Sequence, residues 1–266
     1  MTRKINKKFI DHLRAMTLQP GDSVLIHTSF RAFKPALNYP EEVIESILTC
    51  IGSRGNLMLP TFNYSQPQPE PYYDRDTTPC RTGAVPEYGR QRDDAVRSLH
   101  PTHSVAVIGP DAEELTRNHL NGRTFGVSSP VDRLAQRGGQ VLLLGVTHIA
   151  NSTIHVGEEY AKLPKVLSGP PKPCVKTRMP DGRIINHQLD TSPSCSLGFD
   201  AIETPLRHQG HVTGGMFEKC PMQLIKGKSI IDQTVQLLAD NTDALRCNNP
   251  TCKWCASTKN QDHAEY

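Results

Sequence analysis

Residues 23–60 read SVLIHTSFRAFKPALNYPEEVIESILTCIGSRGNLMLP. The apolar runs at 23–27 and 55–60 are short and bounded by turn residues, which predicts two buried strands. Between them, residues 40–51 have apolar side chains at helical spacing and a proline and two glutamates in the first turn, which predicts a helix. A strand, a helix and a strand at this spacing form a βαβ unit with parallel strands and a right-handed crossover. The stretch therefore predicts an α/β protein built on a mainly parallel sheet.

Similar patterns extend this unit along the rest of the chain. Further buried strands are predicted at 105–109 and 141–146, and shorter β runs at 175–179 and 183–189 flank a Pro-Asp-Gly turn typical of a hairpin. The irregular stretch 64–82 is too long for a passive connection, so we expect it to be functional or mobile. Helices are predicted at 5–16, 85–99, 110–120, 129–134, 199–208 and 229–238.

Together these elements predict a three-layer α/β/α sandwich with a small C-terminal portion that contains the β-hairpin. We expect residues 1–240 to form a single domain and residues 241–266 to form a cysteine-rich tail. The 266 residues have a formal charge of +3 that is not concentrated in a run, so no nucleic-acid partner is expected. No apolar run approaches the roughly 20 residues of a membrane span, and the basic start lacks the apolar region of a signal peptide. We therefore expect a cytoplasmic protein with no membrane partner.

The segment 151–159, NSTIHVGEE, directly follows the strand predicted at 141–146. On a helix, residues three apart share a face, so His155 and Glu158 can touch. A histidine oriented by a carboxylate at the carboxyl end of a buried strand is a common general base. The alternative is a structural role, in which Ser152 or Thr153 caps the helix and the acids only favour its dipole.

Three further polar groups lie at strand ends or in the loops beyond them. They are His27-Thr28-Ser29, His100-Pro-Thr-His-Ser104 and Phe125-Gly-Val-Ser-Ser-Pro130. Ligands of doubly wound sheets bind beyond the carboxyl ends of the strands. The first group lies at such an end, whereas His100 precedes a strand and would need its loop to fold over. Taken singly, each hydroxyl residue is equally well explained as a cap or turn residue.

The cysteines form a separate signal near the C-terminus. Cys247, Cys252 and Cys255 are spaced C-x4-C-x2-C, which is compatible with thiolate ligands of a tetrahedral structural zinc ion. Cys220, His211 or another side chain brought close by folding would supply the fourth ligand. The alternative is three unpaired thiols on a loose tail. The other cysteines are scattered and are expected to be buried or free thiols: Cys50, Cys80, Cys174 and Cys195.

The ordered motifs resemble the aminoglycoside 3-N-acetyltransferase family. They run from Gly21-Asp-Ser-Val-Leu-Ile-His-Thr-Ser29 through His100-Pro-x-x-Ser104, Ser129-Pro130 and Leu143-Leu-Gly145 to Thr153-Ile-His-x-x-Glu158. The resemblance covers roughly residues 5–240. It implies a three-layer α/β/α fold, distinct from that of GNAT enzymes, and transfer of an acetyl group from acetyl-coenzyme A to an amine.

By this resemblance, His155 is the general base that takes a proton from the attacking amine, and Glu158 orients its ring. His100 and Ser104 lie near the thioester, where Ser104 or a neighbouring backbone N–H stabilises the oxyanion. The coenzyme side is assigned to Thr28, Ser29, Arg31 and Phe125, with Ser104 at the thioester and Lys34 beside Arg31 at the phosphates. Direct transfer is preferred to a covalent acyl-enzyme through Cys220.

Two departures from the family pattern leave the contacts to the coenzyme open. Residues 30–40 contain no glycine, and the segment 125–130 is shortened. The sequence is compatible with a homodimer. The acceptor also stays open between an aminoglycoside and another small amine, and a third alternative is a binding protein without turnover. Acidic residues that could meet a polycationic acceptor are Glu70, Asp74, Asp76, Glu87, Asp93 and Asp94.

Overall fold

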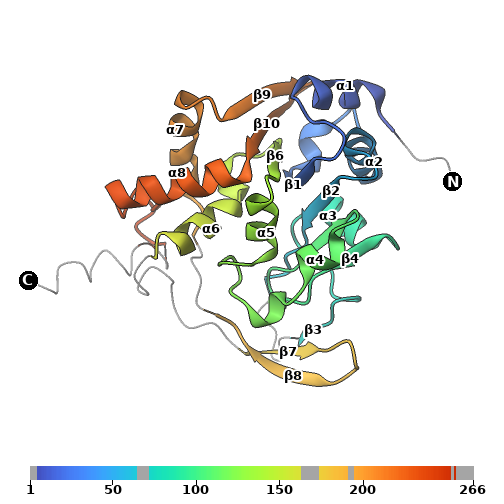
Figure 1. Ribbon diagram of the computed structural model, residues 1–266, viewed down its shortest axis with the longest axis vertical. Coiled ribbons are helices and arrows are strands. Elements are labelled where there is room, and N and C mark those ends of the chain that lie inside the picture. The colour runs from blue at the N-terminus through green and yellow to red at the C-terminus, as the bar shows by residue number, and fades with distance from the viewer. Residues whose placement is uncertain (1–4, 65–71, 163–173, 191–194, 253–254, 256–266) are drawn as a thin grey trace, which may run out of the picture.

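A seven-stranded sheet forms the centre of the molecule (Figure 1). The computed structural model describes residues 5–64, 72–162, 174–190, 195–252 and 255. Along the sheet the strand order is β4-β5-β2-β1-β6-β10-β9. The strands are β1 (Ser23–Thr28), β2 (Asn56–Pro60), β4 (Ala95–Arg97), β5 (Val105–Ile108), β6 (Gln140–Leu144), β9 (Val212–Phe217) and β10 (Cys220–Lys226).

The three central strands are parallel, as the βαβ pattern predicts. β1 pairs in parallel with β2 on one side and with β6 on the other. β5 is antiparallel to both β2 and β4, and β10 is antiparallel to both β6 and β9. Consequently β4, β2, β1, β6 and β9 run in one direction and only β5 and β10 oppose it. The sheet is mixed, with most of its strands in the common direction.

Helices cover both faces of this sheet, and strand side chains alternate between them as the pleat requires. In β1, Val24 and Ile26 join the apolar cluster of one face, and Leu25 joins that of the other. The first cluster includes residues of α1 (Lys7–Ala15), α2 (Pro40–Ile51) and α3 (Ala84–Arg90). The second includes residues of α4 (Ala112–Thr116), α5 (Pro130–Gln136), α6 (Thr153–Tyr160), α7 (Glu203–His208) and α8 (Gly227–Asp240).

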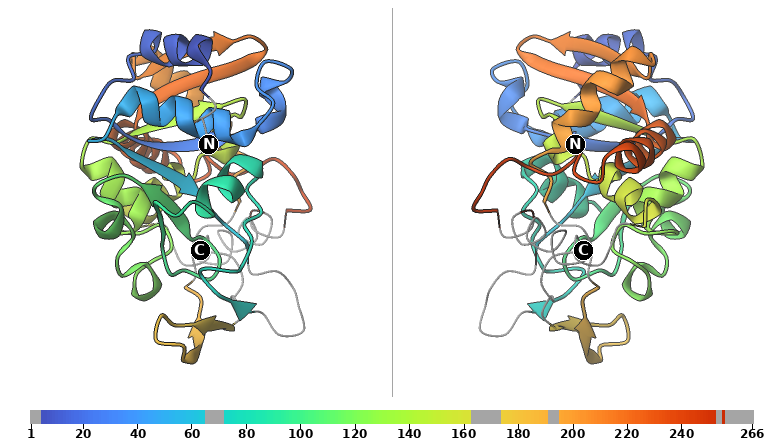
Figure 2. Two further views of the ribbon diagram at one scale, coloured as in Figure 1. Left: turned by 90° about the vertical axis from the view of Figure 1, so that its right-hand side faces the viewer. Right: turned by 90° about the vertical axis from the view of Figure 1, so that its left-hand side faces the viewer.

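A small second sheet lies at one end of the molecule (Figure 2). It consists of β3 (Tyr72–Tyr73), β7 (Cys174–Arg178) and β8 (Ile184–Gln188). β7 and β8 form the predicted hairpin, with Gly182 at φ +85° in the turn, a conformation that glycine adopts without steric cost. β3 belongs to the stretch expected to be an irregular loop, and it pairs in parallel with β7. Residues 65–71 of that stretch lie outside the described residues.

Two of the sequence predictions are wrong. The helix expected over 85–99 ends at Arg90, and residues 95–97 form β4 instead. The strand is stabilised by Arg97, because its buried guanidinium donates hydrogen bonds to loop carbonyls that only the folded chain brings near. The strands β9 and β10 are also absent from the prediction, because Gly214, Gly215 and Pro221 interrupt their apolar pattern.

Candidate active site

The common strand direction brings three polar segments to one edge of the sheet. β1 ends there at Thr28, and β6 ends there before residues 145–152. β4 ends and the antiparallel β5 begins at the same edge, so the connecting loop 98–104 lies there too. His100 therefore does follow a strand that ends at this edge. No sequence pattern indicated this, because residues 95–97 were expected to be part of a helix.

His155 and Glu158 form a hydrogen-bonded pair on one turn of α6. The Nδ1 atom of His155 lies 2.6 Å from Oε2 of Glu158, and both residues are largely buried. A carboxylate accepts only, so this contact assigns the proton to Nδ1 and leaves Nε2 as the basic nitrogen. Between them, Gly157 allows α6 to lie directly on α8, because an added Cβ would come within 2.4 Å of the Thr234 Cβ. The predicted i, i+3 contact is confirmed.

Aromatic rings enclose the imidazole of His155. The ring of Phe125 stacks on it with centroids 5.0 Å apart, and Phe199 approaches edge-on at 4.8 Å. The ring of His103 also packs against Phe125, with ring centroids 5.0 Å apart. Phe125 thus lies beside His155 rather than at a distance from it. No sequence motif indicated Phe199, because this residue lies 44 residues after His155, in the 3-10 turn η5 (Phe199–Ile202).

The start of α6 is anchored to the end of β1 by His27. The backbone N–H of Ser152 donates to Nε2 of His27 at 3.4 Å, and Ser152 Oγ lies at the same distance. His27 is 4% exposed, and burial, with a smaller contribution from nearby His148, lowers the pKa of its imidazole to about 3. A neutral His27 is the state that can accept this hydrogen bond. Ser152 is the N-cap, but no backbone N–H donates to its side chain.

His100 is 1% exposed and its ring is oriented by contacts within the fold. Nδ1 accepts from the backbone N–H of His103 at 3.0 Å, and Nε2 lies 3.3 Å from Thr124 Oγ1. The ring also lies against His119, with centroids 4.4 Å apart. The Thr124 hydroxyl in turn donates to Asp190, which follows β8. Thr124 therefore links His100 to the segment that follows β8.

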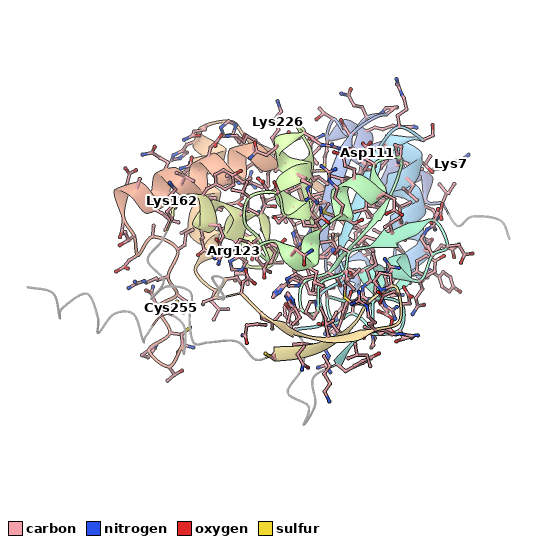
Figure 3. The ribbon with its side chains drawn as sticks, turned by 60° about the horizontal axis from the view of Figure 1, so that its bottom comes forward. Lys7, Asp111, Arg123, Lys162, Lys226 and Cys255 are labelled. Carbon is pink, nitrogen blue, oxygen red and sulfur yellow. The ribbon has the colours of Figure 1, made fainter. Side chains whose placement is uncertain are left out.

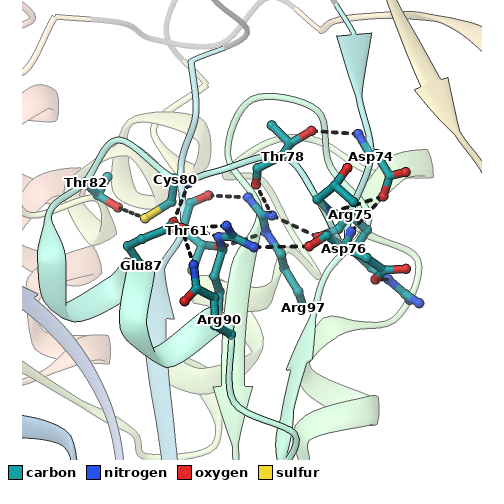
Figure 4. Close-up of polar contacts among 12 residues, drawn as sticks. Thr61, Asp74, Arg75, Asp76, Thr78, Cys80, Thr82, Glu87, Arg90 and Arg97 are labelled. Carbon is teal, nitrogen blue, oxygen red and sulfur yellow. Dashed lines mark hydrogen bonds and ion pairs between the residues drawn. The ribbon is translucent and has the colours of Figure 1, made fainter. Parts of the chain in front are cut away.

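Ser104 is fully buried in a network centred on Arg97. Its hydroxyl donates to the carbonyl of Thr61 at 2.9 Å and accepts from Nε of Arg97 at 3.0 Å. Figure 4 shows the Arg97 guanidinium bound to the carbonyls of Thr61, Arg75 and Thr78. Arg97 fixes the loops at this edge, and no sequence motif indicated it.

Thr28 and Ser29 lie where β1 turns into η1 (Phe30–Phe33). Thr28 Oγ1 is buried and makes no hydrogen bond to any described residue. Arg31, in η1, is exposed. The neighbouring turn after β6 needs Gly145, which has φ +67° and whose added Cβ would lie 2.3 Å from the Ala32 Cβ. The two strand ends therefore approach each other closely beside a free hydroxyl.

Four of the six acidic residues proposed for a cationic acceptor are paired with arginines, and Asp93 is exposed. Asp74 binds Arg178, Glu87 binds Arg90, Asp76 binds Arg75 and Asp94 binds Arg92. Glu70 lies outside the described residues. Two other carboxylates, Glu159 directly after Glu158 and Asp190 after β8, both contact Arg123, which Figure 3 labels.

The fourth member of the cysteine cluster is neither Cys220 nor His211 but another side chain that folding brings close, one of the thiols expected to be scattered. Cys195 joins Cys247, Cys252 and Cys255, and their Sγ atoms all lie within 4.8 Å of one another. Cys220 is instead buried in the central sheet beside Gly145, and His211 is exposed. Cys195 was classed with the scattered thiols because 52 residues separate it from Cys247.

The fold is a mixed α/β fold with a buried histidine–glutamate pair beyond the ends of its central parallel strands. A sequence model described as aminoglycoside 3-N-acetyltransferase matches residues 25–239. The chain belongs to this family, and it is therefore an acyltransferase.

Relatives of established name match across most of the chain. Aminoglycoside N(3)-acetyltransferase IV of Salmonella sp is 30% identical over 226 residues, which cover 84% of this chain and 83% of the relative. Aminoglycoside N(3)-acetyltransferase III of Serratia marcescens is 30% identical and covers 87% and 96%. Among solved structures, a mutant of AAC(3)-IVa in complex with a gentamicin superposes with a TM-score of 0.84 at 26% identity, covering 98% of both chains. None of the described helices is long and apolar enough to cross a membrane.

Proposed function

We propose that this chain transfers the acetyl group of acetyl-coenzyme A to the 3-amino group of an aminoglycoside, with His155 as general base. The observation that carries this is the 2.6 Å contact between His155 Nδ1 and Glu158 Oε2 at the carboxyl edge of the parallel strands. Family membership adds the reaction class, since the relatives are named as N(3)-acetyltransferases.

The proposed reaction is a direct transfer. Nε2 of His155 takes a proton from the attacking amine, whose lone pair forms a bond to the thioester carbonyl carbon. The tetrahedral intermediate collapses by breaking the carbon–sulfur bond, and the departing coenzyme A thiolate takes the proton from the imidazolium. Glu158 stabilises the imidazolium through its charge-assisted hydrogen bond. The products are the N-acetylated amine and coenzyme A, and His155 returns to its neutral state.

For the oxyanion we favour a backbone N–H over the Ser104 hydroxyl. That hydroxyl already donates its proton to the Thr61 carbonyl and cannot donate it a second time without rearrangement. His100 and Ser104 then act as positioning residues that hold the loop 98–104 and its His103 against Phe125. A covalent route through Cys220 is disfavoured, because its thiol is fully buried and burial raises its pKa to about 12.

The coenzyme is proposed to approach the end of β1. Thr28 Oγ1, which has no described partner, and Ser29 would meet its polar chain. Arg31 and Lys34 are exposed in and beside η1, where they can reach phosphates. AAC-IIIb, whose solved complex contains CoASH, shares the fold with a TM-score of 0.73 at 23% identity. Phe125 would line the junction of coenzyme and acceptor, next to His155.

An aminoglycoside is the preferred acceptor because AAC(3)-IVa, a structural relative, is solved with gentamicin and with apramycin. The competing functions are acetylation of another small amine and ligand binding without turnover. Release of coenzyme A thiol is the decisive assay, run with a panel of aminoglycosides and with simple amines. Turnover only with the simple amines would show that the acceptor is a simple amine and not an aminoglycoside. If coenzyme A binds but no amine causes thiol release, the proposed enzymatic function is wrong.

The same assay tests the base. We expect His155→Ala to lower kcat by about 100-fold or more, because a positioned general base contributes roughly 10²–10⁴-fold. His211→Ala changes an exposed histidine between α7 and β9, so it is the matched control and should keep its rate. Near-normal turnover by His155→Ala would eliminate His155 as the base. A structural zinc ion on the C-terminal cysteines would accompany this chemistry without taking part in it.

A further inference from the structure

Four thiol groups converge outside the proposed acetyl-transfer chemistry. The Sγ atoms of Cys195, Cys247, Cys252 and Cys255 all lie within 4.8 Å of one another, and those of Cys195 and Cys252 are 3.6 Å apart. A tetrahedral zinc ion with Zn–S bonds of about 2.3 Å holds its sulfur atoms about 3.8 Å apart. A disulfide would bring two of them to about 2.05 Å, and all eight cysteines, each a described residue, are free of disulfides. The spacing fits a shared metal ion and not a pair of disulfides.

The surrounding backbone is built to hold this arrangement. Between two of the cysteines, Asn249 makes a tight turn, in which its side chain accepts from the Thr251 N–H at 3.0 Å and its carbonyl accepts from the Cys252 N–H at 3.1 Å. Such turns between thiolate ligands direct both sulfur atoms to one point. On the other side, Gly198 lies directly on the tail, since an added Cβ would come within 2.4 Å of the Leu245 carbonyl oxygen.

The interior of this region consists of the sulfur atoms themselves. Cys247, Cys252 and Cys255 are 6–8% exposed, and the apolar cluster they form has Cys195 as its partly buried neighbour among the described residues. Four small side chains bury too little apolar surface to hold two chain segments together in water. A structural zinc ion at such a cluster contributes free energy of folding, because zinc sites fold with their ion.

We propose that Cys195, Cys247, Cys252 and Cys255 bind one structural zinc ion, and that this site holds Phe199 against His155. Cys195 lies four residues before Phe199, and the backbone N–H of Phe199 bonds to the Ser196 carbonyl at 3.0 Å within the same turn. The Phe199 ring meets the His155 imidazole at 4.8 Å. The metal ties this turn to the chain after α8, at the edge of the molecule marked by Cys255 in Figure 3. The second half of the proposal rests on His155 being the base.

Metal content of the purified chain tests the site without reference to activity. We expect about one zinc ion per chain in the wild type, by elemental analysis, and a fall to near zero in Cys195→Ser. Cys174→Ser is the matched control, because Cys174 is an exposed thiol in β7 and outside the cluster, and it should keep its zinc. Absence of zinc from the wild type even after reconstitution, or full retention of zinc by Cys195→Ser, would overturn the site.

Cobalt substitution keeps the test decisive if Cys195→Ser does not fold. Wild-type chain purified with Co²⁺ should show the strong visible and thiolate charge-transfer absorption of a tetrahedral tetrathiolate centre. Stoichiometric Zn²⁺ should bleach it. A spectrum typical of octahedral oxygen ligation, or no stoichiometric cobalt, would contradict four sulfur ligands.

The link to His155 is tested by the pH profile of kcat, which a purely structural loss of active molecules would not shift. Phe199→Leu should retain zinc, lower kcat and shift its pH profile, because the aromatic ring that packs against the imidazole of the proposed base is lost. Folded Cys195→Ser should show the same shift without zinc, whereas Cys174→Ser should not. An unshifted profile in zinc-free Cys195→Ser would refute the positioning role. Failure of His155 as the base would appear separately, as turnover in His155→Ala with zinc still bound.

Discussion

Buried His27 should make the folded chain lose stability as the pH falls below neutrality. Burial, with a smaller effect of His148, lowers the pKa of the folded-state imidazole from 6.5 to about 3. A group with a lowered basic pKa stays neutral in the folded chain but takes up a proton in the unfolded chain. The unfolded state therefore binds more protons between pH 6.5 and about 3, so the free energy of unfolding falls through this window as the pH decreases.

The size of this loss of stability follows from the shift in the pKa of His27. Each pH unit below the unfolded-state pKa costs about 1.4 kcal/mol for such a group, so lowering the pH from 8 to 5 removes about 2 kcal/mol. His119 is buried in the same way, and burial lowers its pKa to about 4, which adds a similar loss. Two such histidines remove about 4 kcal/mol, a large share of the roughly 5–15 kcal/mol that holds a domain folded.

The test compares urea unfolding of wild type and His27→Gln at pH 8 and pH 5. Glutamine can still accept the Ser152 N–H through its side-chain carbonyl, but it does not titrate. The variant should lose about 2 kcal/mol less than the wild type between the two pH values. His211→Gln, at an exposed position, should behave as the wild type does. If the wild type and His27→Gln lose the same free energy of unfolding, His27 does not cause the pH dependence, whatever their absolute stabilities.

Three further substitutions test the site and its scaffold. Glu158→Gln should lower kcat about 10- to 100-fold with little change in KM, because it removes a charge-assisted hydrogen bond to the proposed base; steady-state kinetics with an unchanged kcat would contradict this. Gly157→Ala should destabilise the chain by about 1–3 kcal/mol in urea unfolding despite alanine's helix propensity, since its Cβ meets the Thr234 Cβ on α8; an unchanged free energy of unfolding would show that the two helices can move apart without cost. Gly145→Ala should cost at least about 2 kcal/mol, measured in the same way, because φ is +67° and the new Cβ meets Ala32; a neutral effect would show that the turn relaxes.

Local features of the site could be predicted from the sequence. The spacing of His155 and Glu158 places them on one helical face whatever lies around them, and the structure has them 2.6 Å apart. The βαβ pattern over 23–60 likewise determines that β1 and β2 are parallel. Both follow from periodicities of the backbone that neighbouring residues decide on their own.

Contacts between distant residues could not be predicted in this way. Residues 95–97 continue a helical pattern, yet they form β4 because pairing with β5 and the bonds of Arg97 to distant carbonyls outweigh local propensity. That change of element is what brings His100 to the edge with His155. Phe199 contacts His155 only through the packing of η5, and it has no motif.

Short-range spacing and ordered motifs were enough to predict the class of fold, the family and the histidine–glutamate pair. Only the folded chain shows which side chains surround that pair, and that Cys195, not Cys220 or His211, completes the cysteine cluster. Burial and long-range pairing depend on position in space and not on distance along the chain. Residues 52 apart in the chain, such as Cys195 and Cys247, become neighbours only when the sheet and its helices have assembled around them.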